Sequence, residues 1–166
     1  MKFLLAAINA KYIHSNPGVY SLRAFARTKI PGADIEIGEY TINHQMEWIL
    51  QDIYRRSPDV VGFSCYIWNI SIVEDLITEY HKISPKTKIW LGGPEVSYHA
   101  KEMLEQYPFL AGIMKGEGEV TFREIAVYYQ NQENGMEGKT LEEIHGITYR
   151  DADGAVKSNP WRPVMD

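Results

Sequence analysis

The sequence is poor in cysteine, since Cys65 is the only one among its 166 residues. An intrachain disulfide, a cysteine-rich zinc site and a complete set of cysteine ligands for an iron–sulfur cluster are therefore excluded within this sequence. Cysteine usage of this kind is typical of the reducing cytoplasm, where we expect the protein to be. We expect the thiol, at the end of a predicted strand, to be buried.

Long apolar runs and clusters of basic residues are also missing. The apolar run near the N-terminus, residues 3–8, falls well short of the ~18 residues that span a membrane. Lys and Arg number 17 against 22 Asp and Glu, which gives a net charge of −5. Binding to a nucleic-acid backbone or an anionic membrane needs a basic surface. We therefore expect no nucleic acid and no membrane as partners.

Short apolar runs alternate with amphipathic stretches between residues 3 and 130, a pattern typical of an α/β fold with a parallel sheet. The predicted strands cover residues 3–8, 35–37, 60–64, 89–91 and 112–114. Helices are predicted where apolar residues recur at helical spacing. These helical patterns start at Val19, Met46, Val73, Ala100 and Phe122.

The predicted strand order follows from the pattern of burial. Residues 34–37 alternate between polar and apolar, which predicts an edge strand, whereas residues 3–8 and 60–63 are apolar throughout, as in strands covered on both faces. We predict a flavodoxin-like (Rossmann-like), doubly wound five-stranded parallel sheet with the order 2-1-3-4-5. In such a sheet a ligand binds at the carboxyl ends of the strands, next to the switch point. Asn16-Pro17 and Asn43 are predicted to begin the first two helices.

The C-terminal part differs in character. After residue 130 the sequence becomes polar, and then two short β-prone runs flank Asp153-Gly154, which predicts a β-hairpin. Residues 159–163 contain two prolines and Trp161, which we expect to be exposed. We predict an α/β binding domain over residues 1–130, and a hairpin and linker over residues 131–166 that lead toward a further domain.

Four predicted strand ends carry residues suited to a ligand site. Glycines without a Cβ allow close approach to the sheet, and the hydroxyl and aromatic groups suit a flat ligand. Each loop taken alone is also consistent with a plain turn, and carboxylates at a helix start are favourable on dipole grounds. The candidate residues are Asn9, Ser64, Cys65, Tyr66, Gly92, Gly93, Pro94, Gly116, Glu117, Gly118 and Glu119.

Common phosphate-binding motifs are absent from these loops. Neither the dinucleotide fingerprint G-x-G-x-x-G nor the P-loop G-x-x-x-x-G-K-[ST] occurs in the sequence. A phosphoacceptor receiver domain would need acidic residues where Asn9 and Ser64-Cys65 stand. Lys115 matches the receiver lysine in position, but is equally consistent with a solvated charge at a strand end.

Three motifs in combination point to a family. Val61-Gly62-Phe63-Ser64, Gly92-Gly93-Pro94-Glu95 and Lys115-Gly116-Glu117-Gly118-Glu119 end the third, fourth and fifth predicted strands. With them, residues 1–130 resemble the N-terminal cobalamin-binding domain of cobalamin-dependent radical S-adenosylmethionine enzymes. That group includes anaerobic magnesium-protoporphyrin IX monomethyl ester cyclase and several methyltransferases.

The resemblance implies where a cofactor would lie. A corrin would lie across the carboxyl ends of the strands, with its nucleotide tail between the sheet and the helices. Ser64 and Cys65 would flank the tail, residues 92–94 would give it room, and residues 116–119 would line the far wall.

The sequence departs from one pattern of cobalt ligation. Methionine synthase-like cobalamin domains carry D-x-H-x-x-G after the first strand, and the histidine of that motif ligates cobalt. Here no Asp precedes His14 by two residues, and Gly18 follows it by four residues rather than three. The pattern disfavours His14 as a cobalt ligand, and we expect no metal ligand from this sequence.

The resemblance also implies that this sequence and a radical domain would have separate roles in one parent chain. The cluster motif C-x-x-x-C-x-x-C of the radical domain is absent, so S-adenosylmethionine and the 4Fe-4S cluster would belong to a C-terminal radical domain of the same parent chain. The present sequence would position cobalamin and would not be catalytic by itself. The parent reaction would be oxidative cyclisation or methyl transfer. Two alternatives stay open: a free-standing flavodoxin-like module that binds a nucleotide or flavin, and an interaction domain whose Trp161 docks a partner.

Overall fold

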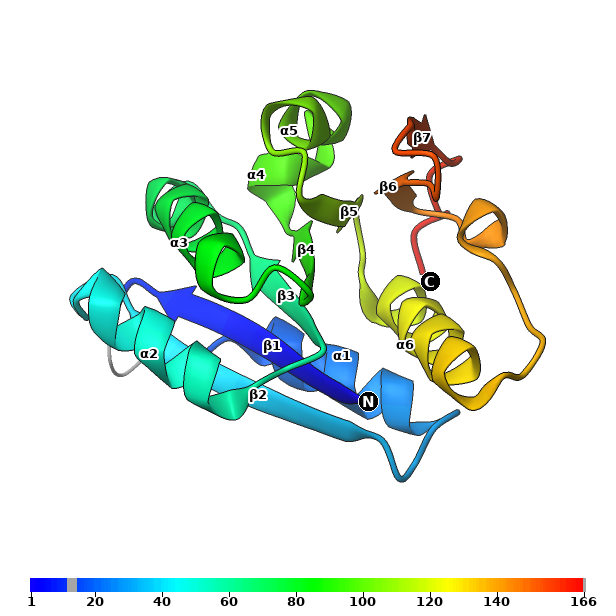
Figure 1. The fold of residues 1–166 in the computed structure, drawn as a ribbon, viewed down its shortest axis with the longest axis horizontal. Coiled ribbons are helices and arrows are strands. Elements are labelled where there is room, and N and C mark those ends of the chain that lie inside the picture. Colours follow the sequence, from blue (N-terminus) through cyan, green and yellow to red (C-terminus); the bar gives the residue numbers. More distant parts are fainter. Residues whose placement is uncertain (12–14, 166) are drawn as a thin grey trace.

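A computed structural model describes residues 1–11 and 15–165 and shows a single mixed sheet with helices on both faces (Figure 1). The strands are β1 (Lys2–Asn9), β2 (Asp34–Thr41), β3 (Val60–Ser64), β4 (Lys88–Gly92), β5 (Leu110–Met114), β6 (Ile147–Arg150) and β7 (Val156–Ser158). The helices are α1 (Pro17–Arg27), α2 (Met46–Arg56), α3 (Ile70–Ile83), α4 (Pro94–Ser97), α5 (Ala100–Gln106), α6 (Glu119–Asn134) and the 3-10 helix η1 (Leu141–Glu143).

The strand order is β2-β1-β3-β4-β5-β6-β7. The first five strands are parallel, which confirms the predicted order 2-1-3-4-5 and the edge position of β2. The predicted hairpin also forms, but it is not an appendage, because β6 pairs antiparallel with β5 and β7 with β6. The sheet therefore has seven strands rather than five, and β5 is an inner strand.

Each face of the sheet is covered by a different set of helices. The apolar side chains of α2, α3 and α5 pack with one face, where Leu4, Val61 and Leu91 belong to the same cluster. Helices α1 and α6 pack on the other face, together with Leu5 and Trp90. No helix in the described part of the chain is long and apolar enough to cross a membrane.

The starts of α1 and α2 test the predicted caps. Asn16 caps α1 by accepting a hydrogen bond from the Gly18 backbone N–H (3.0 Å), and Pro17 is the first helical residue, as predicted. The predicted start of the second helix at Asn43 is wrong, because α2 begins at Met46. The backbone N–H of Asn43 donates to Thr41 Oγ1 (3.2 Å), which keeps Asn43 in the turn after β2.

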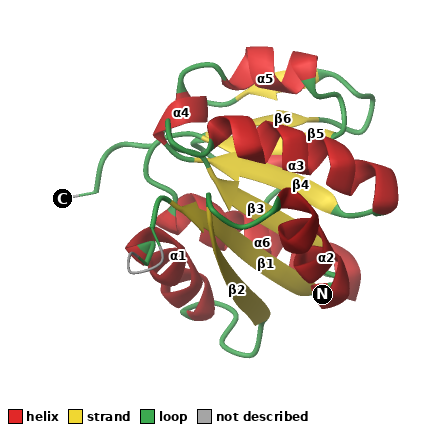
Figure 2. Ribbon diagram, turned by 90° about the vertical axis from the view of Figure 1, so that its left-hand side faces the viewer, coloured by secondary structure: helices red, strands yellow, loops and turns green. Residues whose placement is uncertain are grey.

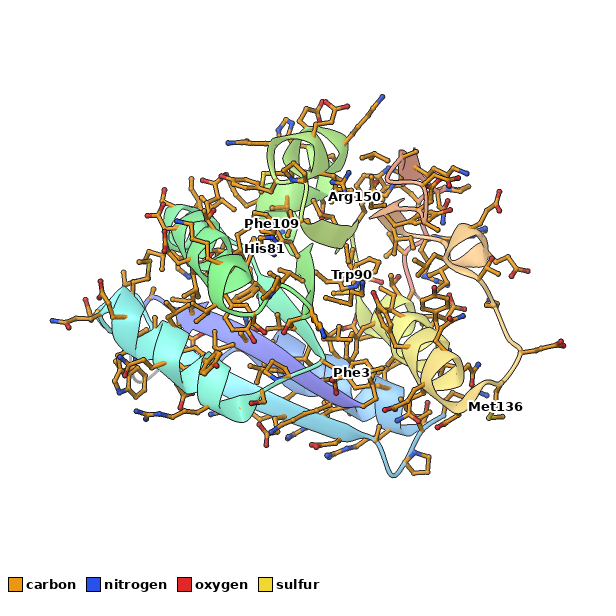
Figure 3. All side chains as sticks on the ribbon, in the orientation of Figure 1. Phe3, His81, Trp90, Phe109, Met136 and Arg150 are labelled. Atoms are coloured by element: carbon orange, nitrogen blue, oxygen red, sulfur yellow. The ribbon has the colours of Figure 1, made fainter. Side chains whose placement is uncertain are left out.

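The face covered by α1 and α6 has an aromatic core (Figure 3). Trp90 lies between the sheet and α6, and its indole N–H donates to the Tyr129 hydroxyl (2.9 Å). Phe3 meets Phe122 of α6 edge to face, with ring centroids 6.3 Å apart. Gly112 makes room for Trp90, because a β-carbon at this position would lie 2.7 Å from an atom of the indole ring.

We predict that Gly112→Ala lowers the free energy of unfolding by about 1–3 kcal/mol, the usual cost of overpacking a core. The added methyl group would also lie 2.8 Å from the Thr148 backbone carbonyl oxygen, which cannot move without disturbing β6. Gly32→Ala is the matched control, because nothing lies within 4 Å of its β-carbon position. Urea unfolding of both variants measures the difference, and equal stability of the two would contradict this account of the core.

Candidate functional site

A groove opens at the carboxyl ends of β3, β4 and β5, and Leu5 of β1 also lines it. Figure 2 shows these strands side by side in the sheet. The volume of the groove is about 430 Å³, within the range of about 300–1,000 Å³ that is usual for small-molecule sites. The groove continues between the sheet and α1, so it lies on the face covered by α1 and α6. This is the switch point at which α/β sheets bind ligands.

The floor of the groove is a bare stretch of sheet, meaning one where a side chain is missing. Gly62 of β3 lies in register between Leu5 of β1 and Trp90 of β4. A β-carbon at Gly62 would meet only a methyl group of Leu5, at 3.5 Å, so the fold itself does not require glycine here. Val19 and Leu22 of α1 form the apolar wall opposite the floor. The missing side chain leaves open a space that a flat ligand group can enter.

The loops after β3 and β4 meet in a very close backbone contact. Gly93 has φ +106°, and a β-carbon there would lie 2.5 Å from the Cys65 carbonyl oxygen. The Cys65 N–H donates to the Gly92 carbonyl (2.7 Å), and the Glu95 N–H donates to the Cys65 carbonyl (3.3 Å). Only glycine tolerates this conformation and this approach at position 93.

Two buried polar side chains hold the loops together. Ser97 Oγ donates to the Gly93 carbonyl (2.8 Å) and accepts from the Gly116 N–H (3.2 Å), which joins the loops after β4 and β5. Asn69 Nδ2 donates to the Ile8 carbonyl (3.0 Å) and to a carbonyl at the end of β3 (2.9 Å), which joins the ends of β1 and β3. Neither residue was predicted from the sequence, which marks them only as polar residues near helix ends.

The mouth of the groove is polar on one side and aromatic on the other. Glu117 and Glu119 line the side next to α6, and Glu119 Oε1 accepts a hydrogen bond from Ser21 Oγ of α1 (3.2 Å). On the other side, Tyr66 lines the groove and its ring stacks on Trp68 at 4.5 Å between centroids, with an interplanar angle of 3°. The mouth can therefore offer both hydrogen bonds and flat apolar contacts.

Of the two interpretations of Lys115, that of a solvated charge at a strand end is wrong, because the residue is only 4% exposed. Its ammonium group donates to Ser158 Oγ (3.0 Å) and to the Asn159 carbonyl (2.9 Å). Burial lowers the pKa of Lys115. The covering residues lie more than 40 positions further along the chain, which is why the local sequence did not reveal this burial.

Nine of the eleven candidate residues line the groove; these are Ser64, Tyr66, Gly92, Gly93, Pro94, Gly116, Glu117, Gly118 and Glu119. Asn9 lies outside the lining and donates to Glu39 Oε1 (3.4 Å). The Cys65 side chain is fully buried in the apolar cluster on the opposite face. His14 lies outside the described residues. No group of three or more His, Cys, Asp or Glu that could hold a metal ion occurs within residues 1–11 and 15–165.

Comparison with known protein families identifies the family of this chain. The B12 binding domain family matches residues 4–126, which contain all but the first two residues of β1 and the whole of β3, β4 and β5. The chain belongs to the B12-binding domain family. The family match thus ends before η1 and the hairpin of β6 and β7.

Three curated relatives of this B12-binding domain are enzymes. Cytidylyl-2-hydroxyethylphosphonate methyltransferase of Streptomyces wedmorensis is 33% identical over 109 residues, which are 65% of this chain and 19% of that protein. The cobalamin-dependent radical SAM methyltransferase TokK of Streptomyces tokunonensis is 37% identical over 71 residues, 41% of this chain and 10% of that protein. The anaerobic magnesium-protoporphyrin IX monomethyl ester cyclase of Cereibacter sphaeroides is 23% identical over 120 residues, 72% of this chain and 19% of that protein. The chain therefore spans a fifth or less of the length of these relatives.

A solved structure supports the fold. The cobalamin-dependent S-adenosylmethionine radical enzyme OxsB, with aqua-cobalamin and S-adenosylmethionine bound, matches with a TM-score of 0.71 and 22% identity. The match covers 97% of this B12-binding domain, hairpin included, and 22% of the OxsB chain. At this identity the likeness concerns the fold, including its C-terminal hairpin.

We predict that Cys65 resists alkylation in the folded B12-binding domain. Burial raises the pKa of the thiol from 9.0 to about 12, so the reactive thiolate is scarce at about pH 8. The neutral thiol favours the folded state fully below pH 9, and this contribution is lost as the pH rises from 9 toward 12. Iodoacetamide followed by mass spectrometry should label the unfolded protein in urea but not the native protein. Rapid labelling of the native protein would contradict the buried position.

Proposed function

We propose that this chain binds cobalamin in the groove and positions it for a larger cobalamin-dependent radical S-adenosylmethionine enzyme. The observation that carries the proposal is the bare floor at Gly62, at the switch point of a chain that belongs to the B12-binding domain family. Cobalamin, when bound, supplies cobalt-centred methyl-transfer or radical chemistry. The part of this chain is to bind and orient the cofactor.

The groove fits the parts of a corrinoid. Its nucleotide tail ends in a flat aromatic base, which suits the space between the Gly62 floor and the apolar wall of Val19 and Leu22. The corrin ring carries amide side chains, which need hydrogen-bond partners at the mouth. The carboxylates of Glu117 and Glu119 offer such partners.

Each candidate residue has a role in this proposal. Ser64 and Tyr66 flank the tail, Gly92, Gly93 and Pro94 give it room, and Gly116, Glu117, Gly118 and Glu119 form the far wall. Asn9 and Cys65 act indirectly, because neither lines the groove. Asn9 holds the end of β1 through Glu39, and the Cys65 backbone holds the loop after β4.

The parent enzyme is proposed from the relatives. TokK is a cobalamin-dependent radical SAM methyltransferase by name, and the chain spans only 10% of its length. S-adenosylmethionine and a 4Fe-4S cluster would bind in a C-terminal radical domain of the same parent chain, since one cysteine cannot ligate a cluster. We favour methyl transfer as the parent reaction, with the magnesium-protoporphyrin oxidative cyclase as the alternative. The free thiol of Cys65 is consistent with a cytoplasmic enzyme.

Titration of the purified chain with hydroxocobalamin, FMN and NAD tests the proposal. We expect hydroxocobalamin to bind with a change in its absorption spectrum, and FMN and NAD not to bind. Binding of FMN without binding of cobalamin, or no cobalamin binding at all, would overturn the proposal in favour of a nucleotide-binding or interaction module.

A substitution in the floor localises the site. We expect Gly62→Leu to weaken cobalamin binding at least about tenfold, a loss of about 1.4 kcal/mol, because the new side chain fills the groove. The fold should persist, since only one methyl group of Leu5 lies within 4 Å of the new β-carbon. Gly32→Leu makes the same chemical change away from the groove and should bind as the wild type does. Unchanged binding by Gly62→Leu would place the cofactor elsewhere.

A further inference from the structure

The C-terminal segment does not leave the domain directly after β7, but lies along the carboxyl edge of the sheet. We call residues 159–165 the strap. The Asn159 side chain donates to the carbonyls of Leu141 (2.8 Å) and Ile144 (2.7 Å), and the Gly146 N–H donates to the Pro160 carbonyl (2.8 Å). The strap is therefore hydrogen-bonded to the segment between η1 and β6.

Arg162 fastens the strap to α6. Its guanidinium forms an ion pair with Glu124 at 2.6 Å and donates to Thr121 Oγ1 at 3.0 Å and to the His145 carbonyl at 3.0 Å. The two charged side chains are only 18% and 17% exposed. A bridge with three partners and this degree of burial holds the strap in one position more firmly than a surface ion pair does.

This arrangement seats Trp161 on the mouth of the groove. Its ring lies over Gly116, where a β-carbon would be 3.6 Å from the ring atoms. The buried ammonium of Lys115 lies 5.3 Å from the ring centroid, and the centroid of the Tyr98 ring also lies 5.3 Å from it. Trp161 lines the groove and is 46% exposed. One part of the indole is thus packed and the rest is open at the groove.

We propose that Trp161 is a cofactor-contacting residue and that Lys115 and Arg162 are positioning residues that hold it there. The strap lies beyond residues 4–126, so this wall of the site comes from outside the segment that defines the family. The inference rests on the proposed function, because the ligand in question is the corrinoid. A preorganised aromatic side chain gives contact area at little entropic cost, which is how such a wall adds affinity.

The test compares three variants of the 166-residue chain by equilibrium dialysis against hydroxocobalamin. We expect Trp161→Ala to raise the Kd about 3- to 10-fold, which matches the usual worth of one aromatic contact. Trp161→Phe should restore most of the affinity. Trp48→Ala is the matched control, because Trp48 is 49% exposed on α2 and lies outside the groove. It should bind as the wild type does.

The positioning residues provide a second measurement. We expect Arg162→Gln to raise the Kd and to change the fluorescence of Trp161, which is isolated by subtracting the spectrum of Trp161→Phe. Circular dichroism at the binding temperature confirms that each variant is folded. Wild-type affinity in folded Trp161→Ala would overturn the inference and leave the strap as a docking element for another domain, with the proposed function intact. Failure of the wild type to bind cobalamin would instead overturn both.

Discussion

The contact between the Gly93 backbone and the Cys65 carbonyl oxygen sets the geometry of the whole carboxyl edge. A β-carbon at position 93 would lie only 2.5 Å from that oxygen, and the φ of +106° also favours glycine. Where the two loops meet, the Glu95 N–H at the start of the short helix α4 donates to the Cys65 carbonyl, just after β3. From there Ser97 reaches both Gly93 and Gly116. The loops that border the groove are thus placed by the chain itself, and a ligand meets a site that needs little further ordering.

The two faces of the sheet differ, and the groove follows from that difference. Helices α2, α3 and α5 cover one face with large aliphatic side chains, and this cluster also encloses Cys65. On the other face α1 and α6 pack around Trp90 and Phe3, while the sheet between Leu5 and Gly62 remains open toward the carboxyl edge. One face therefore supplies most of the closely packed core, and the other combines a core with a binding groove.

The C-terminal hairpin joins these features to the chain segment that follows the family domain. It extends the sheet beyond β5, and its residues cover Lys115. Burial of a lone ammonium group is costly unless its donors are satisfied, and two oxygen acceptors and the Trp161 ring offset that cost here. A chain segment that follows the family domain is thereby tied to the mouth of the groove.

Local sequence patterns determined a large part of the fold of this protein. Apolar periodicity marked the strands and most helices, the alternation in β2 marked its edge position, and the Gly92-Gly93 and Gly116–Glu119 loops marked the carboxyl edge as the candidate site. These features are local, because strand burial, helical spacing and the absence of a Cβ act on neighbouring residues. Only the tertiary structure decided that Ser97 and Asn69 join the loops, that Lys115 is buried and that Trp161 reaches the groove. Those contacts bring together residues far apart in the chain, and no spacing within a single segment encodes the distance between them.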